Sequence, residues 1–469
     1  MLPSAQLRQY RTNERHCPKT GAPYYTPEWA GNQPPGGLPA AVFFGLILRK
    51  SPALVTEAVS CYNTLENRTA AIIVEYHPYG MDSGAGERRF LMNQEWRSIM
   101  DYSSEQLRAL AREFCPAGIA KDPVPLGNGH INDTFLFEAE GRSHVLQRIN
   151  RNVFREPEKV MENFQRVTEH IRRRVALEGG DPEKETLRLN LARDGRPYTF
   201  DENGDLWRSY AFVKDTVTYE RTDDPAMFRE AGRCFGRFHD LLDDFDASLL
   251  YETIPYFHHE PRRWQDFLRA IEENRSGHLQ AAQKEVDSFL TFAALPPVLQ
   301  EELEAGVLPL RVTHNDTKLN NVLMDEKTGR ALCVIDLDTV MPGLAAYDFG
   351  DAIRFGASTA LEDETDLDKV HFSLPYYRAF AEGYLEAFGS RLNEAELLSL
   401  PMGAKLMTLE VGIRFLGDYL NGDVYFKVDY PEHNLVRART QLRLLQEMEA
   451  HWQEMNDIVR ELGKGQRKA

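Results

Sequence analysis

The chain has 469 residues, of which 42% are hydrophobic and 27% charged, so several packed domains are expected and a mainly disordered chain is excluded. Its formal net charge of −17 argues against nucleic acid or an anionic membrane as the main partner. The five cysteines are widely spaced and form no CxxC pair, which indicates reduced thiols and no zinc site.

Residues 1–100 are interpreted as an N-terminal extension of unknown role, because their proline-rich sequence carries no chemical motif. The most apolar stretch, residues 38–48, is too short to cross a bilayer. It also lies too far from the start of the chain to be a signal peptide, so a cytoplasmic location is expected.

Residues 101–215 have the pattern of a small β-rich N-lobe that binds nucleotide. A helix is expected from Ser104, and a second helix is expected after Pro157, where apolar residues recur at helical spacing up to Ile171. The expected strands cover residues 124–126, 134–138, 144–149, 188–190, 198–201 and 207–213. The turn at 139–142 is a hairpin signal between two of these strands.

A glycine-containing loop between the first two strands is a candidate for contact with nucleotide phosphates. Gly127 and Gly129 let backbone N–H groups approach an anion closely. His130 in the same loop fits a contact with phosphate or acceptor, and it fits an exposed loop histidine equally well.

The third strand departs from the protein-kinase pattern. Protein kinases carry a lysine there, whereas this chain places Gln147 at that position with Arg148 beside it. We therefore expect either Arg148 or bound metal ions to offset the charge of the nucleotide phosphates.

Residues 216–469 are expected to form a larger, mainly helical C-lobe. Apolar residues recur at helical spacing over 226–241, 263–294, 370–388, 395–420 and 434–461. A β-rich half followed by a helical half predicts an α+β, two-lobed, protein-kinase-like fold.

The run from His314 to Asn321 carries the strongest chemical signal in the chain. Asn321 follows Asp316 by five residues, and Asp336 arrives after a short predicted hairpin. In phosphoryl transfer an aspartate orients and deprotonates the acceptor hydroxyl, while an asparagine and a second aspartate hold magnesium. Asp316 is therefore the candidate base, and Asn321 and Asp336 are the candidate Mg²⁺ ligands.

Four further charged residues extend this cluster. Asp338 fits a role beside the metal or substrate and a structural role about equally, and Lys318 fits a contact with the transferred phosphate or a solvated side chain. Asp348, three residues before Asp351, comes too many residues after Asp316 to be the kinase metal aspartate. We therefore expect Asp348 to fix a loop or cap a helix.

These motifs closely resemble the N-acetylhexosamine 1-kinases, which belong to the aminoglycoside phosphotransferase and choline kinase-like family. The resemblance rests on residues 314–321, 335–339, 341–343, 348–351, 354–364 and 430–437, and it runs from about residue 104 to 455. It implies phosphorylation of N-acetylglucosamine or N-acetylgalactosamine at the anomeric C1 hydroxyl by ATP with Mg²⁺, giving the α-1-phosphate.

The resemblance also implies site residues. Asp316 would be the base, Asn321 and Asp336 would bind Mg²⁺, and the sugar pocket would include His130, Phe355, Arg414 and Tyr425. An arginine among apolar neighbours needs a partner, which favours Arg414 for the pocket. Phe355 also fits the core, and Phe415 and Phe426 are assigned to it.

Two other functions stay open. The same chemistry on another small alcohol, such as an amino alcohol, an aminoglycoside or homoserine, would require a carboxylate-lined pocket for a cationic acceptor. A catalytically inactive kinase-like binding module would explain the missing lysine, but it has no use for a base and metal ligands together.

Overall fold

A computed structural model describes residues 11–16, 23–28, 102–127 and 131–466. The chain divides into two units, residues 1–90 and 91–469, and each is considered by itself. Within the first unit, β1 (Arg11–His16) and β2 (Pro23–Glu28) pair as antiparallel strands.

The N-lobe of the second unit is an antiparallel sheet of six strands. Its strand order is β3-β4-β5-β8-β6, and β7 pairs with β8. The bounds are β3 (Ile119–Pro125), β4 (Asp133–Ala139), β5 (Arg142–Arg148), β6 (Leu189–Asn190), β7 (Thr199–Phe200) and β8 (Leu206–Ala211). The predicted hairpin is confirmed, since Ala139 pairs with Arg142 and the two turn residues, Glu140 and Gly141, have positive φ.

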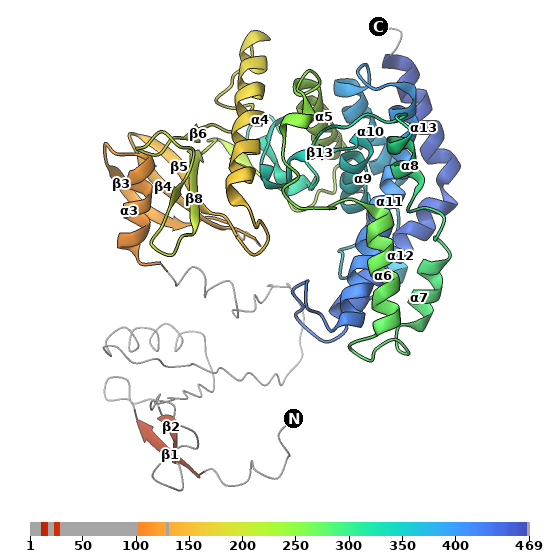
Figure 1. The fold of residues 1–469 in the computed structure, drawn as a ribbon, viewed down its shortest axis with the longest axis horizontal. Helices are drawn as coiled ribbons and strands as arrows, with labels where there is room; N and C mark the ends of the chain where they lie inside the picture. Colours follow the sequence, from red (N-terminus) through yellow and green to blue (C-terminus); the bar gives the residue numbers. More distant parts are fainter. Residues whose placement is uncertain (1–10, 17–22, 29–101, 128–130, 467–469) are drawn as a thin grey trace. The chain divides into compact units, whose positions relative to one another are not determined.

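The two faces of this sheet have different neighbours. Helix α3 (Ser104–Phe114) begins in a capping box at Ser103, and its Leu107 and Leu110 pack in one core with Leu146 and Trp207. Figure 1 shows α3 lying along the sheet. We call this side the α3 face.

The opposite side of the sheet faces α4 (Pro157–Leu177) and is called the α4 face. Pro157 stands at the first turn of this helix, as predicted. Phe164 of α4 lies against Tyr210 and Arg208 of β8. Because side chains alternate along a strand, residues 147, 208 and 210 belong to the α4 face, while residues 146, 148 and 207 belong to the α3 face.

The C-lobe is mainly helical (Figure 1). Its helices are α5 (Pro225–Leu241), α6 (Glu260–Glu273), α7 (Gln283–Leu290), α8 (Val298–Glu304), α9 (Ala345–Gly356), α10 (Leu374–Phe388), α11 (Glu394–Asn421), α12 (His433–Ala450) and α13 (Trp452–Gln466). The predicted two-lobed α+β architecture is confirmed. The ranges 263–294 and 434–461, where helical spacing was predicted, each hold two helices: Asn274 ends α6 in the left-handed conformation, and α12 ends at His451.

Short strands hold the motif region of the C-lobe together. Strand β10 (Arg311–Thr313) pairs with β13 (Met341–Gly343), and β11 (Val322–Asp325) pairs with both β12 (Ala331–Val334) and β9 (Thr216–Val217). Short 3-10 turns η2 (Leu319–Asn321) and η3 (Leu337–Thr339) lie before β11 and after β12. The predicted hairpin between Asn321 and Asp336 is confirmed.

Helix α9 was not predicted, and it crosses α11 at close range. Gly350 and Gly403 stand at the crossing, where an added Cβ on either residue would meet the backbone of the other helix. This contact fixes α9, which carries Asp348 and Asp351. Among the described residues, no helix is both long and apolar enough to cross a membrane.

Candidate active site

The loop after β10 presents Asp316 with two close partners. Lys318 Nζ lies 2.8 Å from one carboxylate oxygen of Asp316, and Asn321 Nδ2 donates to the other oxygen at 3.2 Å. Although burial opposes it, the ammonium of Lys318 and the hydrogen bond from Asn321 hold the pKa of Asp316 below its usual range. Asp316 is therefore ionised at neutral pH, the state that a proton acceptor needs.

His314 connects the loop that carries Asp316 to the segment just before Asp336, the predicted metal ligand. His314 Nε2 donates to the carbonyl of Ile335 at 2.8 Å, and its Nδ1 accepts from the backbone N–H of Asp316 at 3.2 Å. Ile335 also donates its N–H to the carbonyl of Asn321 at 2.9 Å. These bonds bring Asp316, Asn321 and Asp336 to one site, as the sequence predicted.

The donor atoms at this site suit Mg²⁺. Asn321 uses its amide nitrogen for Asp316, which leaves its amide oxygen for a cation. Burial and the negative charges of Asp338 and Asp316 raise the pKa of Asp336 to about 7, although Arg208 and Lys318 oppose this shift. No cluster of three or more His, Cys, Asp or Glu ligands occurs in the described part of the chain. An ion held by two protein oxygens plus phosphate and water fits this donor set.

Asp348 of α9 holds in place the loop from His314 to Asn321, which we call the catalytic loop because it carries the candidate base. Its two carboxylate oxygens accept the backbone N–H groups of His314 and Asn315, each at 2.7 Å. Burial alone would raise the pKa of Asp348, but His239, whose Nε2 lies 3.0 Å away, and the loop N–H groups hold it below its usual range. The loop-fixing role predicted for Asp348 is confirmed.

Asp338 connects the two lobes. One carboxylate oxygen lies 2.5 Å from Arg208 Nη1 of the N-lobe sheet, and the other accepts from Asn132 Nδ2 at 2.6 Å. The side chains of Arg208 and Asp338 are only 1% and 3% exposed. This geometry gives Asp338 the structural role that the sequence left open, and its predicted contact with substrate stays a prediction.

Arg208 occupies the region where we expected Arg148. It pairs across the strands with Gln147, whose Oε1 accepts from Arg208 Nε at 2.9 Å and Nη2 at 2.6 Å. The buried cation of the N-lobe therefore comes from the neighbouring strand and belongs to the α4 face.

The expectation for Arg148 is wrong. Its side chain is on the α3 face, where it donates to Asp133 at 2.7 Å and to Asp205 at 3.0 Å and lies over the Tyr102 ring. Successive side chains of a strand point to opposite faces of the sheet. Arg148 therefore does not lie beside Gln147 in space, although it follows Gln147 in the sequence.

The glycine loop is only partly described. Gly127 has φ of +69°, which favours glycine, and the preceding Leu126 donates its N–H to Thr134 of β4. Gly129 and His130 lie outside the described residues, so their predicted contacts stay predictions.

Arg414 and Tyr425 lie together, and Glu410 and His258 connect them to the loop that carries Asp316. Arg414 of α11 donates to Glu410 at 3.3 Å and to the Tyr425 hydroxyl at 3.4 Å. Tyr425 is 68% exposed, and the carboxylate of Asp418 accepts its backbone N–H at 2.9 Å. Arg414 and Tyr425 therefore form a polar, aromatic wall.

The structure places the other aromatic residues singled out from the sequence in the core and at a small cavity. Phe415 is buried, and Phe426 packs against it with 4.6 Å between ring centroids, so their assignment to the core is confirmed. Phe355 lies at the end of α9 and lines a small cavity of about 30 Å³ with Leu361 and Leu444. Its predicted sugar contact stays a prediction.

A buried carboxyl behind this wall gives a prediction for pH dependence. Burial and the charge of Glu410 raise the pKa of Glu260 from 4.5 to about 8, and Tyr347 donates to its Oε2. Between these values the folded chain keeps the proton that the unfolded chain loses, so stability falls as pH rises towards 8. Glu260→Gln carries no charge and should escape this loss. We expect the Tm of the variant to exceed that of wild type by more at pH 9 than at pH 5, and an equal difference would contradict the assignment.

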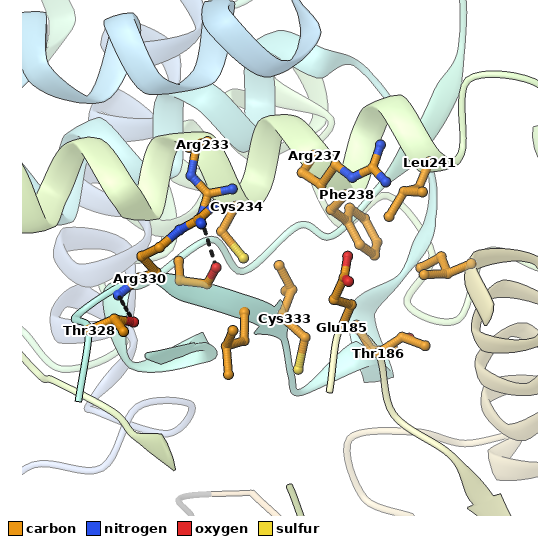
Figure 2. A pocket seen from close by; sticks show the side chains of 15 residues that line it. Glu185, Thr186, Arg233, Cys234, Arg237, Phe238, Leu241, Thr328, Arg330 and Cys333 are labelled. Atoms are coloured by element: carbon orange, nitrogen blue, oxygen red, sulfur yellow. Dashed lines mark hydrogen bonds between the residues drawn. The ribbon is translucent and has the colours of Figure 1, made fainter. Parts of the chain in front are cut away.

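A separate cavity of about 370 Å³ lies between α5 and the β11–β12 hairpin. Figure 2 shows Arg233 and Arg237 of α5 over it and Cys333 of β12 on its other side. Arg233 donates to the carbonyl of Ala331 at 2.8 Å, which ties the helix to the hairpin. Asp316, Asn321 and Asp336 do not line this cavity, so it is distinct from the candidate active site.

Three polar residues of the site were missed from the sequence: Arg208, His258 and Glu410. A charged residue amid the apolar positions of a strand or a helix signals a buried partner, and that signal was present for Arg208 and Glu410. Gln147, the partner of Arg208, and His258, a partner of Glu410, are far away in sequence, so the spacing of residues does not predict these pairs.

Comparison with protein families gives a match to the phosphotransferase enzyme family over residues 122–388, more than half of the chain. This range includes the N-lobe strands from β4 onwards, the catalytic loop and α9.

Solved structures give more distant likenesses. A microcompartment-associated aminopropanol kinase shares 17% identity with a TM-score of 0.45, covering 75% of this chain and 97% of its own. An aminoglycoside phosphotransferase from Alicyclobacillus acidocaldarius shares 12% with a TM-score of 0.47, covering 77% and 96%. A spectinomycin phosphotransferase in complex with ADP and spectinomycin shares 12% with a TM-score of 0.44, covering 78% and 99%. They are too distant to indicate an acceptor.

Proposed function

The chain belongs to the phosphotransferase enzyme family, and from this premise we propose that it phosphorylates N-acetylhexosamines at the anomeric C1 hydroxyl. The phosphoryl donor is ATP, the acceptor is N-acetylglucosamine or N-acetylgalactosamine, and the products are the α-1-phosphate and ADP. The proposed compartment is the cytoplasm, and the proposed cofactor is Mg²⁺ held by Asn321 and Asp336.

The proposed reaction gives each catalytic group one task. The sugar O1 attacks the γ-phosphorus, the bond from that phosphorus to the ADP oxygen breaks, and Asp316 takes the proton that O1 loses. Lys318 keeps Asp316 ionised before the reaction. Mg²⁺, when bound, would neutralise phosphate charge, and Asn321 and Asp336 would hold it.

The observation that carries the choice of acceptor is the positive charge of this wall, which Glu410 and His258 connect to the loop of Asp316. Arg414 stands there, and Arg263 lies close enough that burial and the charge of Arg414 lower its pKa. The carboxylate of Glu410 is already shared between Arg414 and His258. Glu410, the carboxylate that contacts Arg414 in the described part of the chain, is therefore not free to receive an ammonium group, whereas an arginine donates readily to an N-acetyl carbonyl or a hydroxyl.

Exposed aromatic rings support a sugar further. Tyr425 belongs to this wall, and Tyr256, which is 55% exposed, lies two residues before His258 in the sequence. An aromatic face packs on the C–H surface of a pyranose. A cationic acceptor, such as an amino alcohol or an aminoglycoside, is therefore the weaker alternative.

The direct test is turnover of an acceptor panel. Purified protein with ATP and Mg²⁺ is given N-acetylglucosamine, N-acetylgalactosamine, glucose, ethanolamine, homoserine and an aminoglycoside, and ADP release is measured. We expect turnover with at least one N-acetylhexosamine and little with the cationic acceptors. Turnover of a cationic acceptor alone would replace the proposal by the alternative, and no turnover of any acceptor would favour the inactive module.

Replacing the wall arginine should weaken binding of the acceptor. Arg414→Met should raise the KM for the N-acetylhexosamine about 10- to 100-fold, since a hydrogen bond to a charged group contributes about 1.5–3 kcal/mol. The KM for ATP should not change. Arg269→Met removes an exposed arginine of α6 and serves as the control with unchanged kinetics. An acceptor KM that stays constant in Arg414→Met would remove this residue from the pocket.

A further inference from the structure

A buried histidine links the wall of Arg414 and Tyr425, which we call the acceptor wall, to the loop that carries Asp316. His258 lies just before α6 and uses both ring nitrogens: Nδ1 lies 3.2 Å from both carboxylate oxygens of Glu410, and Nε2 lies 3.2 Å from the carbonyl oxygen of Asn315. The side chains of His258 and Glu410 are 8% and 0% exposed. The bonds therefore form away from bulk water, where they are strongest.

The loop residue that His258 contacts is Asn315, which directly precedes Asp316 in the chain. Asn315 has φ of +64°, the left-handed region that a non-glycine residue adopts only when its surroundings enforce it. Its N–H donates to Asp348, and its side chain donates to the carbonyl of Thr339 at 2.9 Å. The remaining polar group, the carbonyl, points to His258. A change at this carbonyl rotates the peptide that joins Asn315 to Asp316.

The chemistry of the partners fixes the protons on the ring. A carbonyl oxygen only accepts, so Nε2 must carry a hydrogen, and an ionised carboxylate at Nδ1 also only accepts. A continuous series of polar contacts thus runs from the acceptor wall to the residue before Asp316. It consists of Arg414 with Glu410, Glu410 with His258, and His258 with the carbonyl of Asn315.

We propose that His258 is a positioning residue, which holds the Asn315 carbonyl so that Asp316 keeps its aim, and that Glu410 couples this hold to Arg414 at the acceptor wall. The proposal rests on the proposed phosphoryl transfer at Asp316. It adds residues that neither touch the phosphates nor remove a proton.

Two substitutions of His258 separate the two halves of the link. His258→Gln reaches with its amide to the position of Nε2, so it keeps the bond to Asn315 and loses Glu410. His258→Asn places its amide near Nδ1, so it keeps Glu410 and loses Asn315. We expect His258→Asn to lower kcat about 10- to 100-fold, because misplacing a catalytic group by about 1 Å costs that much. His258→Gln should retain most of kcat.

Glu410→Gln tests the other end of the link. We expect its acceptor KM to rise, its kcat to fall less than in His258→Asn, and its KM for ATP to stay constant. Glu285→Gln is the matched control, because Glu285 is also a buried glutamate of the C-lobe and pairs with Arg439 away from the loop. It should lower the Tm without changing either KM.

Hydrogen exchange gives a readout that needs no acceptor. The N–H groups of His314 and Asn315 are protected by Asp348, so a peptide covering 312–318 should exchange faster in His258→Asn than in wild type or His258→Gln. Equal exchange and equal kcat in the two His258 variants would overturn the proposal. If wild type turns over no acceptor, the proposed function fails, and the exchange comparison alone decides the positioning role.

Discussion

Asp316→Asn is expected to lower kcat by about 10²- to 10⁴-fold, the usual contribution of a general base. Asparagine keeps the shape of the side chain and the contact with Asn321 but cannot take the proton of the acceptor hydroxyl. Lys318 would lose its ion partner without losing its place. The variant should therefore bind nucleotide with nearly the wild-type Kd, measured by calorimetry alongside the steady-state kinetics.

A surface variant controls for nonspecific effects. Asp287→Asn makes the same change on the exposed side of α7 and should leave kcat unchanged. Wild-type turnover in Asp316→Asn would remove this residue from the role of base. Loss of nucleotide binding together with kcat would instead point to a structural defect.

The second large effect is expected at the contact between the lobes. Arg208→Met leaves the carboxylate of Asp338 buried with Asn132 as its remaining side-chain partner. Removing one member of a buried ion pair costs about 3–5 kcal/mol, because the other charge stays uncompensated. We expect a loss of that size in the free energy of unfolding, measured by urea titration, and a lower kcat because Asp336 lies beside the same pair.

The double variant Arg208→Met with Asp338→Asn supplies the control. It removes the uncompensated charge, so much of the stability lost in Arg208→Met should return. A single variant as stable as wild type would show that the pair contributes little. A double variant less stable than Arg208→Met would show that the cost comes from lost packing against Phe164 instead of charge.

The parts of the fold that could be predicted are those with a clear period or turn signal. The hairpin at 139–142 and the helix after Pro157 follow from local chemistry, and the structure has both. Helix α9 could not be found this way, because Ala345 through Arg354 are all buried and a helix buried on every side has no amphipathic pattern.

The candidate site, too, has residues whose contacts the sequence predicts and residues whose contacts it does not. Asp316 and Asn321 belong to one loop, so their spacing in the sequence sets their contact in space. Arg148 was misplaced because the face of a strand reverses at each residue. Arg208 meets Gln147, and His258 meets Asn315 and Glu410, each more than fifty residues away, and only the packed fold brings them together.

The central claim is that the anomeric hydroxyl of an N-acetylhexosamine accepts the phosphoryl group, and the position of the phosphate in the product tests it most directly. Protein, ATP and Mg²⁺ are incubated with free N-acetylglucosamine or N-acetylgalactosamine, and in parallel with their methyl α-glycosides, in which O1 is blocked. We predict coupling of phosphorus to the anomeric proton in the NMR spectrum of the free-sugar product, and no turnover of the glycosides. Phosphorylation of a methyl glycoside, or phosphate at any other carbon, would contradict the account.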